Sequence, residues 1–136
     1  MNKVNINNEE FTKTETYKKF MKENPGRGNL AIRAYAAGGA VPISNLTIEV
    51  SRTIDDNKVI FYEGITNESG IIEKISLPAP KKDTNDLNIP LSTSYQITAT
   101  YLPNNTILSY SVNIYDNICV LQNISIIPEV IERNEI

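Results

Sequence analysis

The residues that could carry chemistry in this chain of 136 residues are few. Histidine is absent and Cys119 is the only cysteine. These counts exclude a Ser-His-Asp triad, a Cys-His dyad and zinc sites built on imidazole or on paired thiolates. Cys119 lies in the apolar run 118–121, where we expect a small buried hydrophobe rather than a nucleophile.

The densest cluster of oxygen ligands is Asp55, Asp56 and Asn57. Its spacing lacks the alternating ligands of a calcium loop, and Asp and Asn are favoured in hairpin turns for backbone reasons. An enzyme would need Asp55 and Asp56 to converge with Glu73 on a concave pocket, and nothing resembles two carboxylates poised across a bond to be cleaved. We therefore predict a chain that is not an enzyme and that holds no metal ion and no cofactor.

Two glycine-containing segments are interpreted as a turn and a connector rather than as binding sites. Thr66–Gly70 fits a tight turn in which Gly70 takes a positive φ and the Asn67 side chain caps the backbone, and we expect it to fix the register of the strands on either side. Gly26–Gly28 follows a predicted helix and precedes a strand, which is the wrong order for a helix N-terminus to receive a phosphate. We interpret it as a connector.

Charge and aromatic content narrow the class of partner. The chain has 13 basic and 16 acidic residues, a formal net charge of −3 and no long basic cluster, so nucleic acid is not an expected partner. The lysine pairs 18–19 and 81–82 are interpreted as solvated faces. The tyrosines of the predicted strands are expected to pack across strands, because a chain without tryptophan lacks a flat platform for sugar rings.

The first ten residues, MNKVNINNEE, contain no apolar region of a secretory signal. No stretch approaches the eighteen or so apolar residues that a membrane span needs, so a membrane is not an expected partner. We expect synthesis in the cytoplasm. The protein then stays in the cell, or leaves it by lysis or by deposition in a spore layer or a virion.

A helix is predicted over residues 9–23, started by Asn7 or Asn8 and stopped by the Asn-Pro-Gly of residues 24–26. Four apolar side chains fall near one of its faces at helical spacing: Phe11, Tyr17, Phe20 and Met21. Such a stripe packs on the chain's own domain or contacts a partner. We take these four as the predicted partner-binding residues.

From residue 28 the apolar period changes from helical to two. Seven short strands are predicted, beginning near residues 30, 46, 59, 71, 95, 108 and 118 and separated by turn residues. This pattern is typical of an all-β, seven-stranded antiparallel sandwich of the immunoglobulin-like type with a short N-terminal helical arm. The predicted divisions are an arm with its helix at 1–27, the β-sandwich domain at 28–128 and a polar tail at 129–136.

The order of turns and strands resembles a known family. The run 28–50, the Val-Pro-Ile-Ser-Asn turn of residues 41–45, the Thr66–Gly70 turn and the LPAP of residues 77–80 resemble prealbumin-like modules related to carboxypeptidase regulatory domains. The helix-to-strand entry FMKENPGRG at 20–28, with that LPAP, resembles the accessory region of clostridial-type spore cortex-lytic enzymes. The resemblance implies an accessory module standing alone, and no catalytic residue is carried over from it.

A second comparison is with collagen-adhesin B-type repeats, which join a first-strand Lys to a last-strand Asn. Asn123 could accept such a bond, but the first strand offers Arg33 and no Lys, so we predict no internal isopeptide.

These observations favour a non-catalytic structural or binding module of a spore-envelope or cell-wall-associated assembly. It would bind a protein partner or self-associate through the N-terminal arm, with strand edges open to β-augmentation, and peptidoglycan or a cortex hydrolase are candidate partners. Two alternatives are a phage virion or tail-like accessory protein and a regulatory partner of a spore cortex hydrolase.

Overall fold

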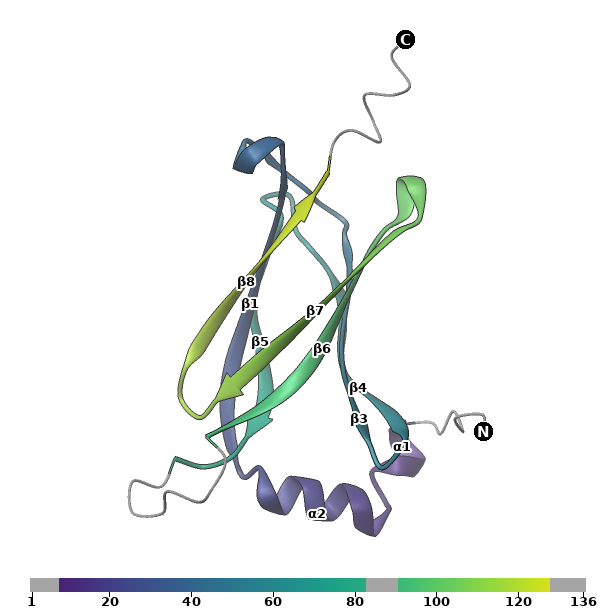
Figure 1. Cartoon of the computed structure of the whole chain (residues 1–136), viewed down its shortest axis with the longest axis vertical. Coiled ribbons are helices and arrows are strands. Elements are labelled where there is room, and N and C mark those ends of the chain that lie inside the picture. The colour runs from purple at the N-terminus through teal and green to yellow at the C-terminus, as the bar shows by residue number, and fades with distance from the viewer. Residues whose placement is uncertain (1–7, 83–90, 128–136) are drawn as a thin grey trace.

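The structure is a computed structural model that describes residues 8–82 and 91–127. Two β-sheets pack face to face, and two short helices lie at one end of the sandwich (Figure 1). The elements in chain order are α1 (Asn8–Phe11), α2 (Glu15–Glu23), β1 (Gly26–Ala36), β2 (Val41–Pro42), β3 (Thr47–Ile54), β4 (Asn57–Ile65), β5 (Ile71–Ala79), β6 (Ser92–Tyr101), β7 (Thr106–Tyr115) and β8 (Cys119–Ile126). The all-β sandwich predicted from the alternating pattern is confirmed.

One sheet places β1 in the middle, with β8 along one edge and β5, followed by the short β2, along the other. The other sheet has the order β4-β3-β6-β7. The described residues form eight strands rather than the predicted seven. The additional strand is β2, in which Val41 and Pro42 pair with Ala36 and Tyr35. The sequence alone had placed these two residues in a turn.

One pairing corrects the expectation of an antiparallel sandwich. β8 runs parallel to β1, from the pair Asn29 and Cys119 to the pair Ala36 and Ile126, whereas the other strand pairs are antiparallel. The reason is the corner at residues 116–118, which carries the chain from β7 in one sheet to β8 in the other (Figure 1). Because β8 then joins the first strand rather than its neighbour in sequence, no hairpin forces the two to run in opposite directions.

The core lies between the sheets and follows the alternation of the strands. Along β1, buried and less buried residues alternate without interruption, and β6 shows the same period. The largest fully buried apolar side chains come from both sheets: Leu30, Ile32, Leu46, Ile48, Leu77, Tyr95, Ile97, Ile114 and Ile124. The core is therefore continuous across the sandwich.

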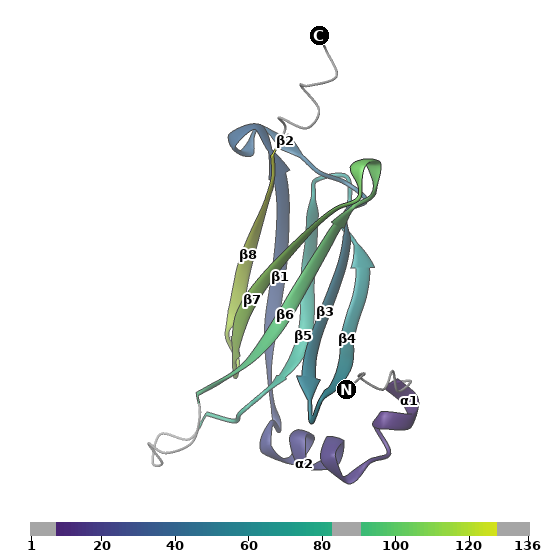
Figure 2. The same cartoon turned by 45° about the vertical axis from the view of Figure 1, so that its right-hand side comes forward.

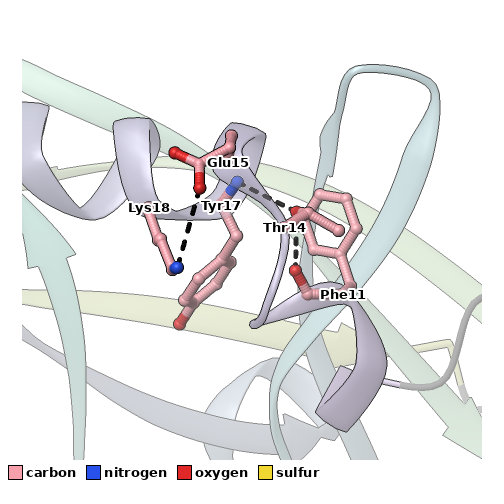
Figure 3. Close-up of polar contacts among 5 residues, drawn as sticks. All are labelled: Phe11, Thr14, Glu15, Tyr17 and Lys18. Carbon is pink, nitrogen blue, oxygen red and sulfur yellow. Dashed lines mark hydrogen bonds and ion pairs between the residues drawn. The ribbon is translucent and has the colours of Figure 1, made fainter.

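The single helix predicted over residues 9–23 is two helices, α1 and α2, and this corrects the prediction. Thr14 separates them, because its extended backbone and its side chain cap the start of α2 (Figure 3). Its Oγ1 donates a hydrogen bond to the carbonyl of Phe11 at 2.7 Å and accepts one from the Tyr17 amide at 3.3 Å. Glu15 and Lys18 pair across the first turn of α2 at 3.7 Å. A threonine is a favoured N-cap, so the α2 cap lies at Thr14 rather than at the start of the predicted helix.

α2 ends at Glu23, as the Asn-Pro-Gly signal predicts. The division into an arm at 1–27, a sandwich at 28–128 and a tail at 129–136 stays a prediction. β1 already begins at Gly26, and the tail lies outside the described residues.

The two predicted tight turns have the expected backbone. Asp55 and Asp56 both take positive φ in the hairpin between β3 and β4. Gly70 has φ 74°, and the Asn67 side chain accepts hydrogen bonds from the amides of Ser69 and Ile71 at 2.9 and 3.0 Å. The second turn does not fix a hairpin register, however, because β4 and β5 belong to different sheets. Its role is to carry the chain from one sheet to the other.

Glycines permit a close contact where β1 meets the corner at 116–118. A Cβ on Gly28 would lie 2.2 Å from the Tyr115 carbonyl, and one on Gly26 would lie 2.6 Å from the Asp116 carboxylate. The Arg27 amide donates to that carboxylate at 3.2 Å, and the Arg27 carbonyl accepts from the Asn117 amide at 2.9 Å. The connector predicted at Gly26–Gly28 is therefore the first part of β1, and it holds the corner that directs β8.

Candidate functional site

The predicted partner-binding residues of the arm lie against the chain's own sandwich. Phe11 and Phe20 are buried in the core, and Tyr17 and Met21 are half-buried beside it. The ring of Phe20 lies 5.8 Å from that of Phe61 on β4, which in turn meets Tyr95 of β6 edge-on at 5.3 Å. The stripe therefore packs on its own domain, the first of the two alternatives. A partner contact through these four residues stays a prediction.

Asn24 joins the end of α2 to the sandwich. This buried side chain donates to the Phe20 carbonyl at 2.8 Å and accepts a hydrogen bond from the buried Thr93 hydroxyl at the start of β6. The backbone amide of Asn24 donates a hydrogen bond to the Met21 carbonyl at 3.2 Å. Asn24 thus satisfies the last carbonyls of the helix while holding it on the sandwich, so the arm and the sandwich share one core.

The carboxylates that an enzyme would need do not converge. Asp55 and Asp56 are exposed in the β3–β4 turn of one sheet, and Glu73 is exposed on β5 of the other. None of the three lines either of the two pockets described for this chain. Among residues 8–82 and 91–127, no group of three or more Cys, Asp or Glu side chains is placed to hold a metal ion.

Four tyrosines of the strands pack in the core or against it. Tyr95 is 2% exposed and donates a hydrogen bond to the Pro78 carbonyl at 2.5 Å. Burial raises the pKa of Tyr95, because the phenolate would lose its hydration. Tyr62, Tyr101 and Tyr110 are partly buried against the core.

Apart from the two-residue β2, the described part of the sandwich has four outer strands, and these differ sharply in charge. β4 carries Lys58 and Glu63, and β5 carries Glu73, Lys74 and a proline. β7 (TILSYSVNIY) and β8 (CVLQNISI) carry no charged residue and no proline over ten and eight residues. Charges and prolines are the usual protection of a sheet edge against pairing with another chain. The β7 and β8 edges lack that protection.

The two uncharged edges lie on the same side of the molecule. β7 and β8 meet at the corner of residues 116–118 and diverge from it in both views (Figures 1 and 2). Apolar side chains are exposed along them: Ile107 at 63%, Leu121 at 55% and Ile118 at 50%, with Tyr115 and Ile127 also exposed. We name β7 and β8 the uncharged edges of the sandwich; the corner between them carries Asp116.

Cys119 corrects a prediction of the sequence. It is exposed at the start of β8 rather than buried, and it is a free thiol. The edge strand β8 begins within the apolar run 118–121, with Cys119 and Leu121 exposed and Val120 half-buried. The sequence showed an apolar run, but it did not show that the strand would have only one covered face.

A pocket of about 940 Å³ lies where α2 meets the end of the sandwich. Its wall includes Phe20 and Lys22 of α2, Arg52 of β3 and the lysine pair 81–82 that follows β5. From the sequence alone, that lysine pair was interpreted as a solvated face. The lining comes from five segments that are separate in the chain, so no local sequence motif predicts the pocket.

The chain was compared with known proteins, and its fold is similar to that of solved structures. No protein-family model matches the chain, and no curated protein is significantly similar to it. Transthyretin from Sparus aurata is 13% identical with a TM-score of 0.43, over 71% of this chain and 90% of that one. An (S)-allantoin synthase is 15% identical with a TM-score of 0.49, over 80% of this chain and 45% of that one. This chain thus spans less than half of the allantoin synthase chain.

Likenesses of this strength assign neither a family nor an activity. The two-sheet architecture that the prealbumin-like resemblance implies is present in the strand pairing itself. The resemblance to spore cortex-lytic enzymes stays a prediction. None of the helices in the described parts of the chain is both long enough and apolar enough to cross a membrane.

Proposed function

We propose that this chain is a non-catalytic structural module that assembles with further copies of itself through the free edge of β8. The single observation that carries the proposal is the contrast between the charged edges β4 and β5 and the uncharged edges β7 and β8. An unprotected edge of eight residues offers a row of backbone donors and acceptors to a further strand.

The absence of charge on β8 favours a second copy as the occupant. When a strand pairs with itself antiparallel, residues near the two-fold axis face their own kind, and like charges opposite each other are destabilising. β8 has no such charges. Its exposed Leu121 would also be covered in the pair.

The hydrogen-bonding positions of that edge follow from the ladder with β1. The Ile118 carbonyl accepts from the Asn29 amide at 2.9 Å, and backbone groups alternate sides along a strand. The backbone groups of Cys119, Leu121, Asn123 and Ser125 therefore point to the free edge. An antiparallel self-pair must match these odd positions, which places the two-fold axis at Gln122 or Asn123 near the middle of β8.

The setting we propose is a spore envelope or another cell-wall-associated layer, as the resemblance of residues 20–28 and 77–80 suggests. A virion or tail-like accessory protein is an alternative that would also self-associate. A regulatory partner of a cortex hydrolase would instead be a monomer that binds its enzyme. Oligomeric state therefore separates the first two settings from the third.

The test replaces Asn123 in the full chain. In Asn123→Pro the outward amide is lost and the β1 ladder is kept, whereas Asn123→Ala keeps the amide and is the matched control. Light scattering at increasing concentration should give oligomers for the parent and Asn123→Ala and a monomer for Asn123→Pro. Circular dichroism verifies that all three are folded, and Leu121→Lys is a second edge variant with an intact backbone.

Monomers for the parent chain at every concentration would overturn the proposal. Equal oligomerisation of Asn123→Pro and Leu121→Lys would do so as well. Removing residues 1–24 is a weaker test, because it strips buried Phe11 and Phe20 from the core and exposes new apolar surface.

A further inference from the structure

The pocket at the end of α2 concentrates positive charge in an acidic protein. Its lining includes four cationic side chains, Lys22, Arg52, Lys81 and Lys82, and one carboxylate, Glu23. The lining therefore carries four positive charges against one negative, a net +3, whereas the whole chain carries −3. Such a local reversal of sign attracts anions into a concave site.

These cations are not neutralised by the parts of the chain that the structure describes. The ion pairs found there are Lys18 with Glu15 and Lys58 with Glu49, and both lie outside the lining. The nearby Asp116 carboxylate accepts hydrogen bonds from the backbone amides of Arg27 and Lys82 at 3.2 and 3.1 Å. These hydrogen bonds fix the position of the Asp116 carboxylate, which keeps its negative charge and lies outside the lining.

Arg52 is the fixed cation of the group. Its Nη1 donates to the Ser94 carbonyl at 2.8 Å and to the Ser94 hydroxyl at 3.1 Å, and its guanidinium lies 5.7 Å from the centre of the Phe20 ring. Its Nε is buried and has no hydrogen-bond partner. A guanidinium held in one orientation loses little freedom when an anion approaches it.

The remaining lining suits a ligand larger than a bare ion. Phe20, Pro25 and Pro80 provide apolar wall, and the side chains of Ser92 and Asn113 provide polar groups. The volume of about 940 Å³ is within the range of small-molecule sites, at about 300–1,000 Å³. The carbonyls of the last turn of α2 are partly satisfied by Asn24, so they compete less for Lys22.

We infer that this pocket binds an organic anion that presents two or more negative charges as phosphate or carboxylate oxygens. Arg52 holds one anionic group, and Lys81 and Lys82, which line the same pocket, hold another. Charge-assisted hydrogen bonds to such oxygens are the strongest that these side chains form. The inference does not depend on the β8 edge, so either proposal can fail without the other.

The test is isothermal titration calorimetry of the full chain with sodium pyrophosphate and, separately, with sodium citrate, at an ionic strength of about 0.15 M. The parent should bind at least one of them with saturation at one site. In the double variant Lys81→Gln/Lys82→Gln, and in Arg52→Gln, the affinity should fall about tenfold or more. Pyrophosphate binding alone indicates a phosphate ligand, and citrate binding alone indicates a carboxylate ligand.

The matched control is Lys18→Gln/Lys19→Gln, which changes the net charge equally with two neighbouring lysines outside the pocket lining. Its affinity should stay within about twofold of the parent, because distant exposed charges are screened. Absence of saturable binding of both probes at 10 mM, taken here as roughly the upper limit for a specific site, would overturn the inference. An equal loss in the two double variants would also overturn it, because it would indicate only a general attraction of anions.

Discussion

Replacing Thr66 with valine tests how the two sheets are joined. Thr66 is 1% exposed and lies at the start of the turn between β4 and β5. Its hydroxyl donates to the Ile43 carbonyl at 2.7 Å and accepts from the Leu46 amide at 3.0 Å. This one side chain therefore fixes the segment that leads from β2 to β3. Valine has nearly the same shape and lacks the hydroxyl.

The expected loss follows from the two backbone groups that valine would leave without that partner. A buried polar group that loses its hydrogen bond costs about 1–3 kcal/mol, so two such groups predict a loss of about 2–6 kcal/mol in the free energy of unfolding. Thr66→Ser keeps both hydrogen bonds and removes one methyl group, at a cost of about 1 kcal/mol. Because small domains are stable by only about 5–15 kcal/mol, the valine variant should be severely weakened.

Urea denaturation followed by circular dichroism and tyrosine fluorescence measures both variants, since the chain has seven tyrosines and no tryptophan. We expect the order parent, Thr66→Ser, Thr66→Val from most to least stable, with similar dependence on urea in all three. A valine variant as stable as the serine variant would refute the reasoning, because burial of the side chain rather than its hydrogen bonds would then carry the contribution.

Two further predictions concern the backbone and the core. Gly70→Ala should cost at least about 1 kcal/mol more than Gly38→Ala in calorimetric melting, since both glycines have positive φ but only the Cβ at Gly70 would meet a backbone atom, the Ala34 carbonyl oxygen at 2.3 Å. Equal costs would show that the turn shifts freely. Tyr95→Phe should cost about 1 kcal/mol at neutral pH through the lost hydrogen bond to Pro78. Burial raises the pKa of Tyr95, so above pH of about 10 the unfolded chain releases the phenol proton while the folded chain keeps it, and the parent loses stability with rising pH. The urea midpoints of the parent and of Tyr95→Phe should therefore converge between pH 8 and 11. A constant difference between the two midpoints over this range would contradict the burial of the Tyr95 hydroxyl.

Local features were predictable because neighbouring residues determine them. The turn at Asp55 and Asp56, the positive φ of Gly70 and the end of α2 at Glu23 each depend on residues a few positions apart. Alternation of apolar residues predicted seven of the eight strands. It missed β2, because two residues are too few to show a period.

Features that depend on distant segments were not predictable. The pattern in β8 is apolar, but only the corner at residues 116–118 places it beside β1 and leaves Cys119 exposed. The lysine pair 81–82 resembles the pair 18–19 in sequence. Only the fold brings the pair 81–82 into the same pocket lining as Arg52. The absence of charge in β7 and β8 is visible in the sequence, although nothing there shows that both strands lie at sheet edges.

The exposed thiol of Cys119 provides the most direct measurement of the β8 pair, because it is the chain's only cysteine and lies on the strand in question. A nitroxide attached to Cys119 allows the distance between the labels of two copies to be measured by pulsed electron–electron double resonance. A two-fold axis at Gln122 separates the two Cys119 residues by six strand positions, and an axis at Asn123 by eight, which predicts about 20–27 Å between their Cα atoms. A distribution with a component near this range, lost in Asn123→Pro and kept in Asn123→Ala, is the result we expect. A labelled chain without such a component, at concentrations where the parent is oligomeric, would contradict assembly through β8.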